Sequence, residues 1–164
     1  MNELELPQNT VLLGEREYAT AIDVVITEAQ EQLLFFEQDC SVGDFASIKR
    51  FDLLTAFLNK SGLTKLTIIL HHTDFFTAAC PRLFSLLSTF SHKMVVYQTN
   101  DHAKIAKDCF ILADDKAYIS RFHIDQARCK YALNDMEKTA SLAERFDELL
   151  LETTRTISTT KLGL

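Results

Sequence analysis

The stretch DHAKIAKDCFILADDKAYI, residues 101–119, contains the side chains best suited to chemistry. His102 could attack phosphorus, Lys104 could stabilise charge on phosphoryl oxygens, and Asp108 could support the site. Side chains two residues apart on a strand project from the same face, so His102 and Lys104 could act together there. These three residues are the catalytic candidates, and the chemistry they suggest is phosphoryl transfer.

A second set of polar residues follows three apolar runs of strand length. LLFFEQ ends at residue 38, KLTIIL at 70 and KMVVYQ at 98. Strand ends in open α/β sheets face the crevice where ligands bind, so the residues that follow could line one rim with His102. They are Asp39, Cys40, His71, His72 and Asn100. The rim lacks a clear basic cradle, which supports phosphate binding only weakly, and polar loop caps are the favoured interpretation of the two histidines.

Composition narrows the class of protein. The 164 residues fit one domain, 47% of them are hydrophobic, and the net charge is -6. This charge disfavours a broad nucleic-acid footprint or an anionic membrane surface, although a local basic groove is compatible with it. There is no secretory signal and no apolar run approaching about 20 residues, so we expect a cytoplasmic protein. The four cysteines are widely spaced, which favours reduced, buried thiols, and neither a metal nor a cofactor is expected.

The apolar spacing alternates between helical and strand patterns along the chain. Helical spacing covers 15–30, 46–62, 81–91 and 134–153, whereas strand-like runs cover 32–37, 65–70, 93–98, 109–114 and 116–121. This order predicts an α/β domain with a mixed, mostly parallel sheet flanked by helices. We expect the domain to span 15–152, after an N-terminal segment 1–14, and the tail 153–164 to be loosely attached.

Two small basic spots add a further hypothesis. The first is Lys49 with Arg50, and the second runs from Arg121 to His123 and continues at Arg128 and Lys130. Aromatic side chains within the second spot could stack a base while the cations contact a nucleic-acid backbone. At this net charge, a solvated face is the favoured interpretation of both spots.

The order of elements resembles a phospholipase D-like domain. FILADDKAYISR, residues 110–121, and the late helix LNDMEKTASLAERFDELL, residues 133–150, carry the resemblance. The chain is more specifically similar to small bacterial proteins in which this fold lacks the catalytic motif. The resemblance implies the fold, and it implies a homodimer because enzymes of this superfamily assemble two such units about a two-fold axis.

In that superfamily the motif is H-x-K-x-x-x-x-D, supplied twice, and one His attacks phosphorus while the other protonates the leaving group. If His102 and Lys104 begin the motif, the Asp position holds Cys109, and Asp108 falls one residue short. A slip of one residue on a strand reverses the side chain.

A second register starts from the acidic end of the motif. With Asp115 as the Asp, the His and Lys positions hold Asp108 and Phe110, and this register fits the strand best. With the preceding acid, Asp114, those positions become Lys107 and Cys109 instead. No register supplies all three residues.

The leading hypothesis is therefore a non-catalytic binding or interaction domain, homodimeric, with an unknown protein or small-molecule partner. One alternative is a divergent phosphodiesterase or nuclease that uses His102 and Lys104 at a dimer crevice. Another is a nucleic-acid-binding module without cleavage. Whether His102 points into the crevice or out to solvent distinguishes the first two.

Overall fold

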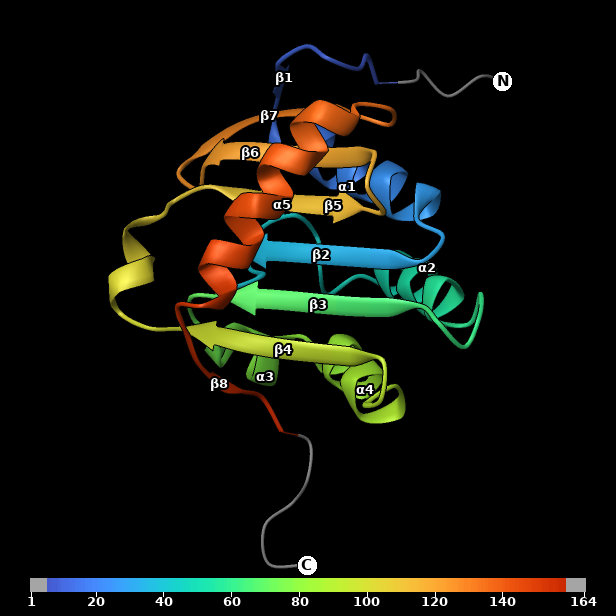
Figure 1. The fold of residues 1–164 in the computed structure, drawn as a ribbon, viewed down its shortest axis with the longest axis vertical. Coiled ribbons are helices and arrows are strands. Elements are labelled where there is room, and N and C mark those ends of the chain that lie inside the picture. Colours follow the sequence, from blue (N-terminus) through green and yellow to red (C-terminus); the bar gives the residue numbers. More distant parts are fainter. Residues whose placement is uncertain (1–5, 159–164) are drawn as a thin grey trace, which may run out of the picture.

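An eight-stranded sheet organises residues 6–158, the part of the chain that the computed structural model describes. Its order is β1-β7-β6-β5-β2-β3-β4-β8 (Figure 1). The strands are β1 Leu12–Leu13, β2 Gln32–Glu37, β3 Lys65–Leu70, β4 Met94–Thr99, β5 Cys109–Ala113, β6 Ala117–His123, β7 Gln126–Ala132 and β8 Thr153–Thr156. The mixed α/β sheet is confirmed. Parallel pairing is confined to β2, β3 and β4, and every other pair between the described strands is antiparallel, so the sheet is not mostly parallel as expected, because β5, β6 and β7 follow one another as antiparallel neighbours.

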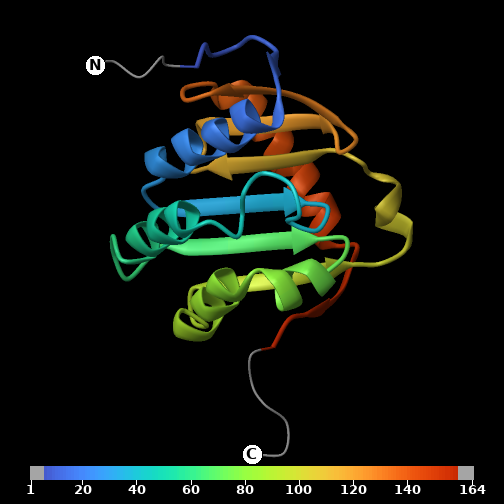
Figure 2. The ribbon, with the colours of Figure 1, turned by 180° about the vertical axis from the view of Figure 1, so that it is seen from behind.

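Helices cover both faces of this sheet. The first face carries α1 Glu15–Glu28, α2 Ile48–Leu58, α3 Asp74–Ala79 and α4 Pro81–Thr89 (Figure 2), and α5 Met136–Leu150 crosses the other (Figure 1). Local chemistry sets where two helices begin. The Ser47 hydroxyl accepts the Arg50 N–H at 3.1 Å, and the Asp135 carboxylate accepts the Lys138 N–H at 2.9 Å. None of the helices within 6–158 is long and apolar enough to cross a membrane.

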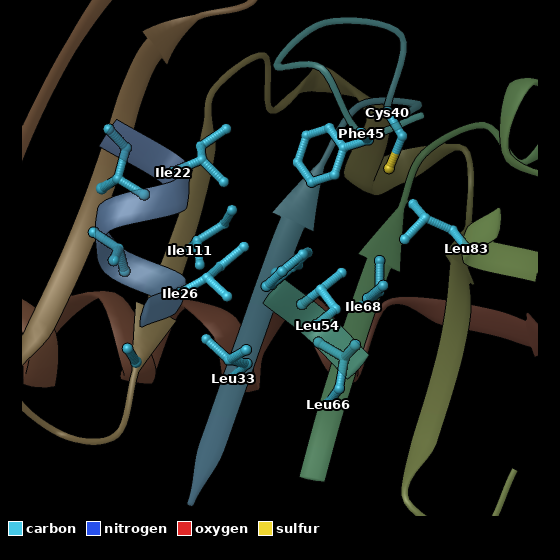
Figure 3. Close-up of a cluster of buried hydrophobic side chains, with 14 of the residues drawn as sticks. Ile22, Ile26, Leu33, Cys40, Phe45, Leu54, Leu66, Ile68, Leu83 and Ile111 are labelled. Carbon is cyan, nitrogen blue, oxygen red and sulfur yellow. The ribbon is translucent and has the colours of Figure 1, made fainter. Parts of the chain in front are cut away.

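Each face of the sheet has its own hydrophobic core. Leu33 of β2 packs beneath α1 and α2 with Ile22 and Leu54 (Figure 3), whereas Phe36 of the same strand packs beneath α5 with Phe110. Because successive strand residues face opposite sides, a strand covered on both sides is a nearly continuous apolar run. This is why the central strands were predictable from sequence.

The two edges of the sheet were harder to predict. Residues 153–156 form β8 and pair with β4, which corrects the expectation of a loose tail up to residue 158. Backbone groups hold this segment, through Asn100 N–H to Glu152 O at 2.7 Å and Ile157 N–H to Val96 O at 2.9 Å. Strand β1 lies within the expected N-terminal segment and pairs with β7. Residues 1–5 and 159–164 of the two predicted terminal segments lie outside the described residues.

Candidate functional site

The sheet topology brings polar residues together along one edge of the sheet, by which we mean from here on the side where the strand ends meet and not an outer strand. Parallel strands β2, β3 and β4 all end there, and β5, antiparallel to β2, begins there. Strand β6 pairs antiparallel with β5 and therefore ends at the same edge. The segment before β5, which includes the 3-10 helix His102–Ile105, accordingly lies beside the ends of β3 and β4 (Figure 1).

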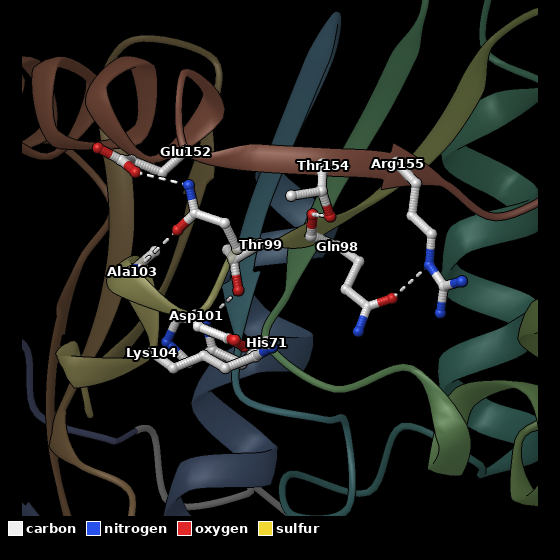
Figure 4. Close-up of polar contacts among 10 residues, drawn as sticks. His71, Gln98, Thr99, Asp101, Ala103, Lys104, Glu152, Thr154 and Arg155 are labelled. Atoms are coloured by element: carbon white, nitrogen blue, oxygen red, sulfur yellow. Dashed lines mark hydrogen bonds and ion pairs between the residues drawn. The ribbon is translucent and has the colours of Figure 1, made fainter.

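Buried side chains hold the backbone that leads into β5. The imidazole of His71 is 1% exposed, with Nδ1 2.7 Å from the Thr99 hydroxyl (Figure 4) and Nε2 2.7 Å from the Ala106 carbonyl. Burial lowers the pKa of His71, so the neutral ring donates from Nε2 to the carbonyl and accepts the hydroxyl proton at Nδ1. Gln38 Nε2 donates to the carbonyls of Ala106, at 3.0 Å, and Asp108, at 2.9 Å. His71 is therefore a structural residue of this edge.

The segment fixed by His71 and Gln38 presents Lys107 and Asp108 to a groove of about 680 Å³ between the end of β6 and α5. We call this the basic groove. Its lining residues are Ile105, Lys107, Asp108, Ser120, Phe122, His123, Lys138, Ser141, Leu142 and Arg145. Among these lining residues, Lys107, Lys138 and Arg145 are cations, His123 is a further basic side chain, and Asp108 is the single carboxylate. The groove is therefore a local excess of positive charge on a protein of net charge -6.

An ion pair crosses the basic groove. Arg145 Nη2, from α5, is bonded to Asp108 Oδ1, and these side chains are 40% and 23% exposed. Arg145 also borders a second hollow of about 430 Å³ that includes His102 and Glu152. The Arg145 side chain thus stands between the two hollows.

The predicted catalytic residues do not meet. His102 is 80% exposed, and its Nδ1 is 3.7 Å from Glu152 Oε2. The Lys104 ammonium lies 3.2 Å from the Asp101 carboxylate instead (Figure 4). The two residues belong to a 3-10 helix, in which positions two apart point in different directions, and not to a strand. Asp108 is engaged by Arg145 in the basic groove.

The acids after β5 have different surroundings. Asp115 is exposed in the turn before β6, and Phe110, at the Lys position of the register that starts from it, is buried under α5. Asp114 has a left-handed φ of 56°, and its carboxylate accepts the backbone N–H groups of residues 30, 31 and 32 at 2.9–3.0 Å. Asp114 thus ties the β5–β6 turn to the start of β2. Counted from Asp114, the His position is Lys107, in the basic groove.

The predicted rim of polar residues does not form. Cys40 is buried in the core beneath α1–α4, where burial raises the pKa of its thiol, whereas His71 packs edge-to-face against Phe36 beneath α5. Cys40 and His71 therefore lie on opposite faces of the sheet, and His72 is exposed. Asp39 accepts the N–H and hydroxyl of Ser41 in a local turn.

Asn100, the last residue of the predicted rim, joins two neighbouring segments. Its amide donates to Glu152 Oε2 at 2.7 Å, and its carbonyl oxygen accepts the Ala103 N–H at 3.0 Å. Asn100 thus anchors the 3-10 helix to the segment after α5. No group of three or more His, Cys, Asp or Glu side chains within residues 6–158 could hold a metal ion.

Two arginines of the predicted basic spots, Arg50 and Arg121, are buried, which corrects the interpretation of a solvated face for them, whereas Arg128 is exposed. Arg121 is 1% exposed, forms two bonds to the Glu15 carboxylate at 2.6 and 3.0 Å, and lies over the Tyr18 ring. Arg50 is also 1% exposed and bonds Asp23 at 2.7 Å. Neither forms part of a solvated face. Phe122, between Arg121 and His123 in sequence, is 43% exposed and lines the basic groove.

A buried carboxyl group on β2 was missed from the sequence. Glu37 is 0% exposed, and its Oε2 accepts the Tyr18 hydroxyl at 2.8 Å. Its Oε1 has no hydrogen-bond partner among residues 6–158. Burial raises the pKa of Glu37 to about 8, against opposing effects from Tyr18, Arg50 and Arg121. Its place at the end of an apolar run was the only signal available.

Comparison of the coordinates with solved structures identifies the fold as that of the phospholipase D family. Nuc from Salmonella typhimurium, a phospholipase D family member, is 11% identical, with a TM-score of 0.64, covering 92% of this chain and 99% of that one. NucT from Helicobacter pylori is 12% identical, with a TM-score of 0.57 and coverages of 88% and 96%. The predicted fold is thus confirmed, and at these identities the likeness concerns the fold alone.

The chain belongs to the family described as a domain of unknown function, DUF7931, whose model matches residues 15–159. A third structure, the archaeal chromatin protein TrmBL2, shows a novel mode of DNA binding and is 13% identical, with a TM-score of 0.65. The match covers 92% of this chain but 55% of TrmBL2, so the chain spans about half of that protein. No curated protein is significantly similar in sequence.

Proposed function

We propose that this protein is a non-catalytic phospholipase D-like domain whose basic groove binds a phosphate group of its ligand. The observation that carries the proposal is the charge of the groove, where Lys107, Lys138 and Arg145 converge and Asp108 is the single carboxylate. Guanidinium and ammonium groups are the side chains that bind phosphate best, and a concave surface concentrates their field.

The absence of catalysis is supported by the surroundings of the predicted nucleophile. His102 lies outside the basic groove, and Lys104 is paired with Asp101. A lysine stands at the His position when the motif is counted back from Asp114, and a protonated ammonium group has no lone pair with which to attack phosphorus. The motif is thus degenerate in this proposal. Phosphodiesterase or nuclease activity is the alternative hypothesis that experiments must test.

A single-stranded nucleic acid is a second candidate ligand for the same groove. Phe122 is 43% exposed beside Lys107, and an exposed ring next to cations is typical of surfaces that stack a base while the backbone is held electrostatically. The likeness to TrmBL2, a DNA-binding protein, favours this candidate over other polyanions.

A cytoplasmic homodimer is part of the proposal. Two large hydrophobic side chains are exposed on elements at the edge of the sheet that bears the groove: Ile105 at 79% and Leu151 at 87%. A two-fold axis at this edge would cover them and bring two basic grooves together, as the family resemblance implies.

Binding of a short, fluorescently labelled DNA strand and of inorganic phosphate tests the proposal. Lys107→Gln/Lys138→Gln is compared with wild type and with Lys65→Gln/Lys116→Gln, a charge-matched control in which both lysines are exposed, Lys65 at the start of β3 and Lys116 in the turn between β5 and β6. We expect the double variant to weaken binding of both probes. For the DNA strand it should also lower the slope of log K against log salt by about 0.7 per lost contact, while the control leaves the affinities and the slope unchanged. Absence of binding by wild type, or an equal loss in the control, would overturn the proposal.

A further inference from the structure

We infer that Asp108 is a built-in competitor for the ligand of the basic groove, and that binding exchanges its carboxylate for a phosphate group on Arg145. This inference rests on the proposed function and names the residue that sets affinity and selectivity. It predicts preference for oxyanions that offer two acceptor oxygens to one guanidinium.

The first observation is the position of the pair. Among the described residues, Asp108 is the only carboxylate lining the basic groove, and it neutralises the one guanidinium there through the Arg145 Nη2–Asp108 Oδ1 contact. The carboxylate therefore occupies the place on Arg145 that an incoming phosphate oxygen would take. Carboxylate and phosphate match the planar guanidinium in the same way, so the two acceptors compete for the same donors.

The second observation is that the pair is incomplete. Asp108 accepts from Nη2 alone, and Arg145 Nε is buried without a hydrogen-bond partner among residues 6–158. A buried donor without a partner is costly, and Nε and Nη2 form one edge of the guanidinium group. A phosphate with two free oxygens could accept from both, so the exchange would replace one hydrogen bond by two. A single-atom anion such as chloride would have to share one acceptor between the two donors.

The third observation concerns the backbone. The carbonyl of Asp108 is fixed by Gln38 at 2.9 Å, and that of Ala106 by both Gln38 and His71. The carboxylate consequently stays beside Arg145 whether or not it is bonded, at a high effective concentration. A ligand must therefore displace the Asp108 carboxylate from Arg145 in order to bind, and this competition lowers the affinity for ligands that are weak hydrogen-bond acceptors.

A double-mutant cycle tests the inference, with inorganic phosphate as the probe and calorimetric titration as the readout. The variants are Asp108→Asn, Arg145→Gln and the two combined. Asp108→Asn keeps the shape of the side chain and the carbonyl that Gln38 binds. Thermal unfolding of each variant reports whether it is folded. Only variants that unfold cooperatively enter the cycle, and Asp108→Ser replaces any Asp108→Asn that does not.

We expect Asp108→Asn to tighten phosphate binding about fivefold, because the free energy of a partly exposed ion pair corresponds to about this factor in affinity. In the Arg145→Gln background the same change should alter the affinity less than about twofold, because the competition acts through Arg145. An equal gain in both backgrounds would indicate simple charge repulsion and overturn the inference.

Two further outcomes separate the inference from the proposed function. If neither wild type nor Asp108→Asn binds phosphate, the groove is not an anion site and both fail. If wild type binds through Lys107 and Lys138 but Asp108→Asn changes nothing, the inference alone fails.

Discussion

Replacing Glu37 by Gln should change how the stability of the protein depends on pH. Glu37 is fully buried at the end of β2, and the two arginines that influence it are each bonded elsewhere, Arg50 to Asp23 and Arg121 to Glu15. No guanidinium group therefore compensates the carboxylate directly. Burial dominates and raises its pKa to about 8, so the carboxyl group is protonated in the folded protein at neutral pH.

The sign follows from proton binding in the two states. The unfolded chain ionises Glu37 near pH 4.5, and the folded protein near pH 8, so between these values the folded state holds more protons. Stability from this group is complete below pH 4.5 and is lost as the pH rises through about 8. At about 1.4 kcal/mol per pH unit, the loss between pH 5 and pH 8 is roughly 3 to 4 kcal/mol.

Urea unfolding at several pH values between 5 and 8 measures this effect. Glu37→Gln cannot titrate, so its free energy of unfolding should gain about 3 to 4 kcal/mol relative to wild type from pH 5 to pH 8. Glu28→Gln, an exposed change on α1, should run parallel to wild type over the same range. Parallel curves for wild type and Glu37→Gln would mean that Glu37 is ionised in the folded protein, and the reasoning would be refuted.

Two further predictions concern residues that position the groove edge and the β5–β6 turn. His71 should titrate below its ordinary value of 6.5, so stability from the neutral ring is full above pH 6.5 and falls as the pH drops below it; an NMR titration of the imidazole with a midpoint at or above 6.5 would contradict this. Asp114→Ala should lower the free energy of unfolding by about 2 kcal/mol, because three backbone N–H groups lose their acceptor at a left-handed residue, whereas Asp114→Asn should cost less. Equal urea midpoints for Asp114→Ala and wild type would show that these hydrogen bonds from the Asp114 carboxylate do not stabilise the fold.

The central fold was predictable because its signals are hydrophobic. Strand β3 is a compact apolar run, and α5 has an apolar stripe after an acidic cap, so both were found with nearly correct ends. Strand β8, Thr153–Thr156, has no such signal because backbone pairing with β4 holds it. An outer strand that is held by backbone hydrogen bonds alone produces no pattern of hydrophobic residues from which it could be predicted.

The site was less predictable because it depends on which side chains meet. His102 and Lys104 stand two apart, and a strand would have aligned them, but the chain forms a 3-10 helix there. Lys138 and Arg145 belong to the last helix, and only the crossing of α5 over the sheet brings them to Lys107. Helical charges of this kind are typical of any solvated face, so the sequence alone could not distinguish the groove from ordinary surface.

The most direct test of a non-catalytic groove measures binding and cleavage in one sample. A labelled single DNA strand and a chromogenic phosphodiester are incubated with wild type, His102→Ala and His123→Ala, and the native mass is recorded alongside. We predict that wild type binds the strand as a dimer and that neither substrate is hydrolysed above the rate without protein. Hydrolysis by wild type that is abolished by either histidine substitution would contradict the proposal and identify a working phosphodiesterase.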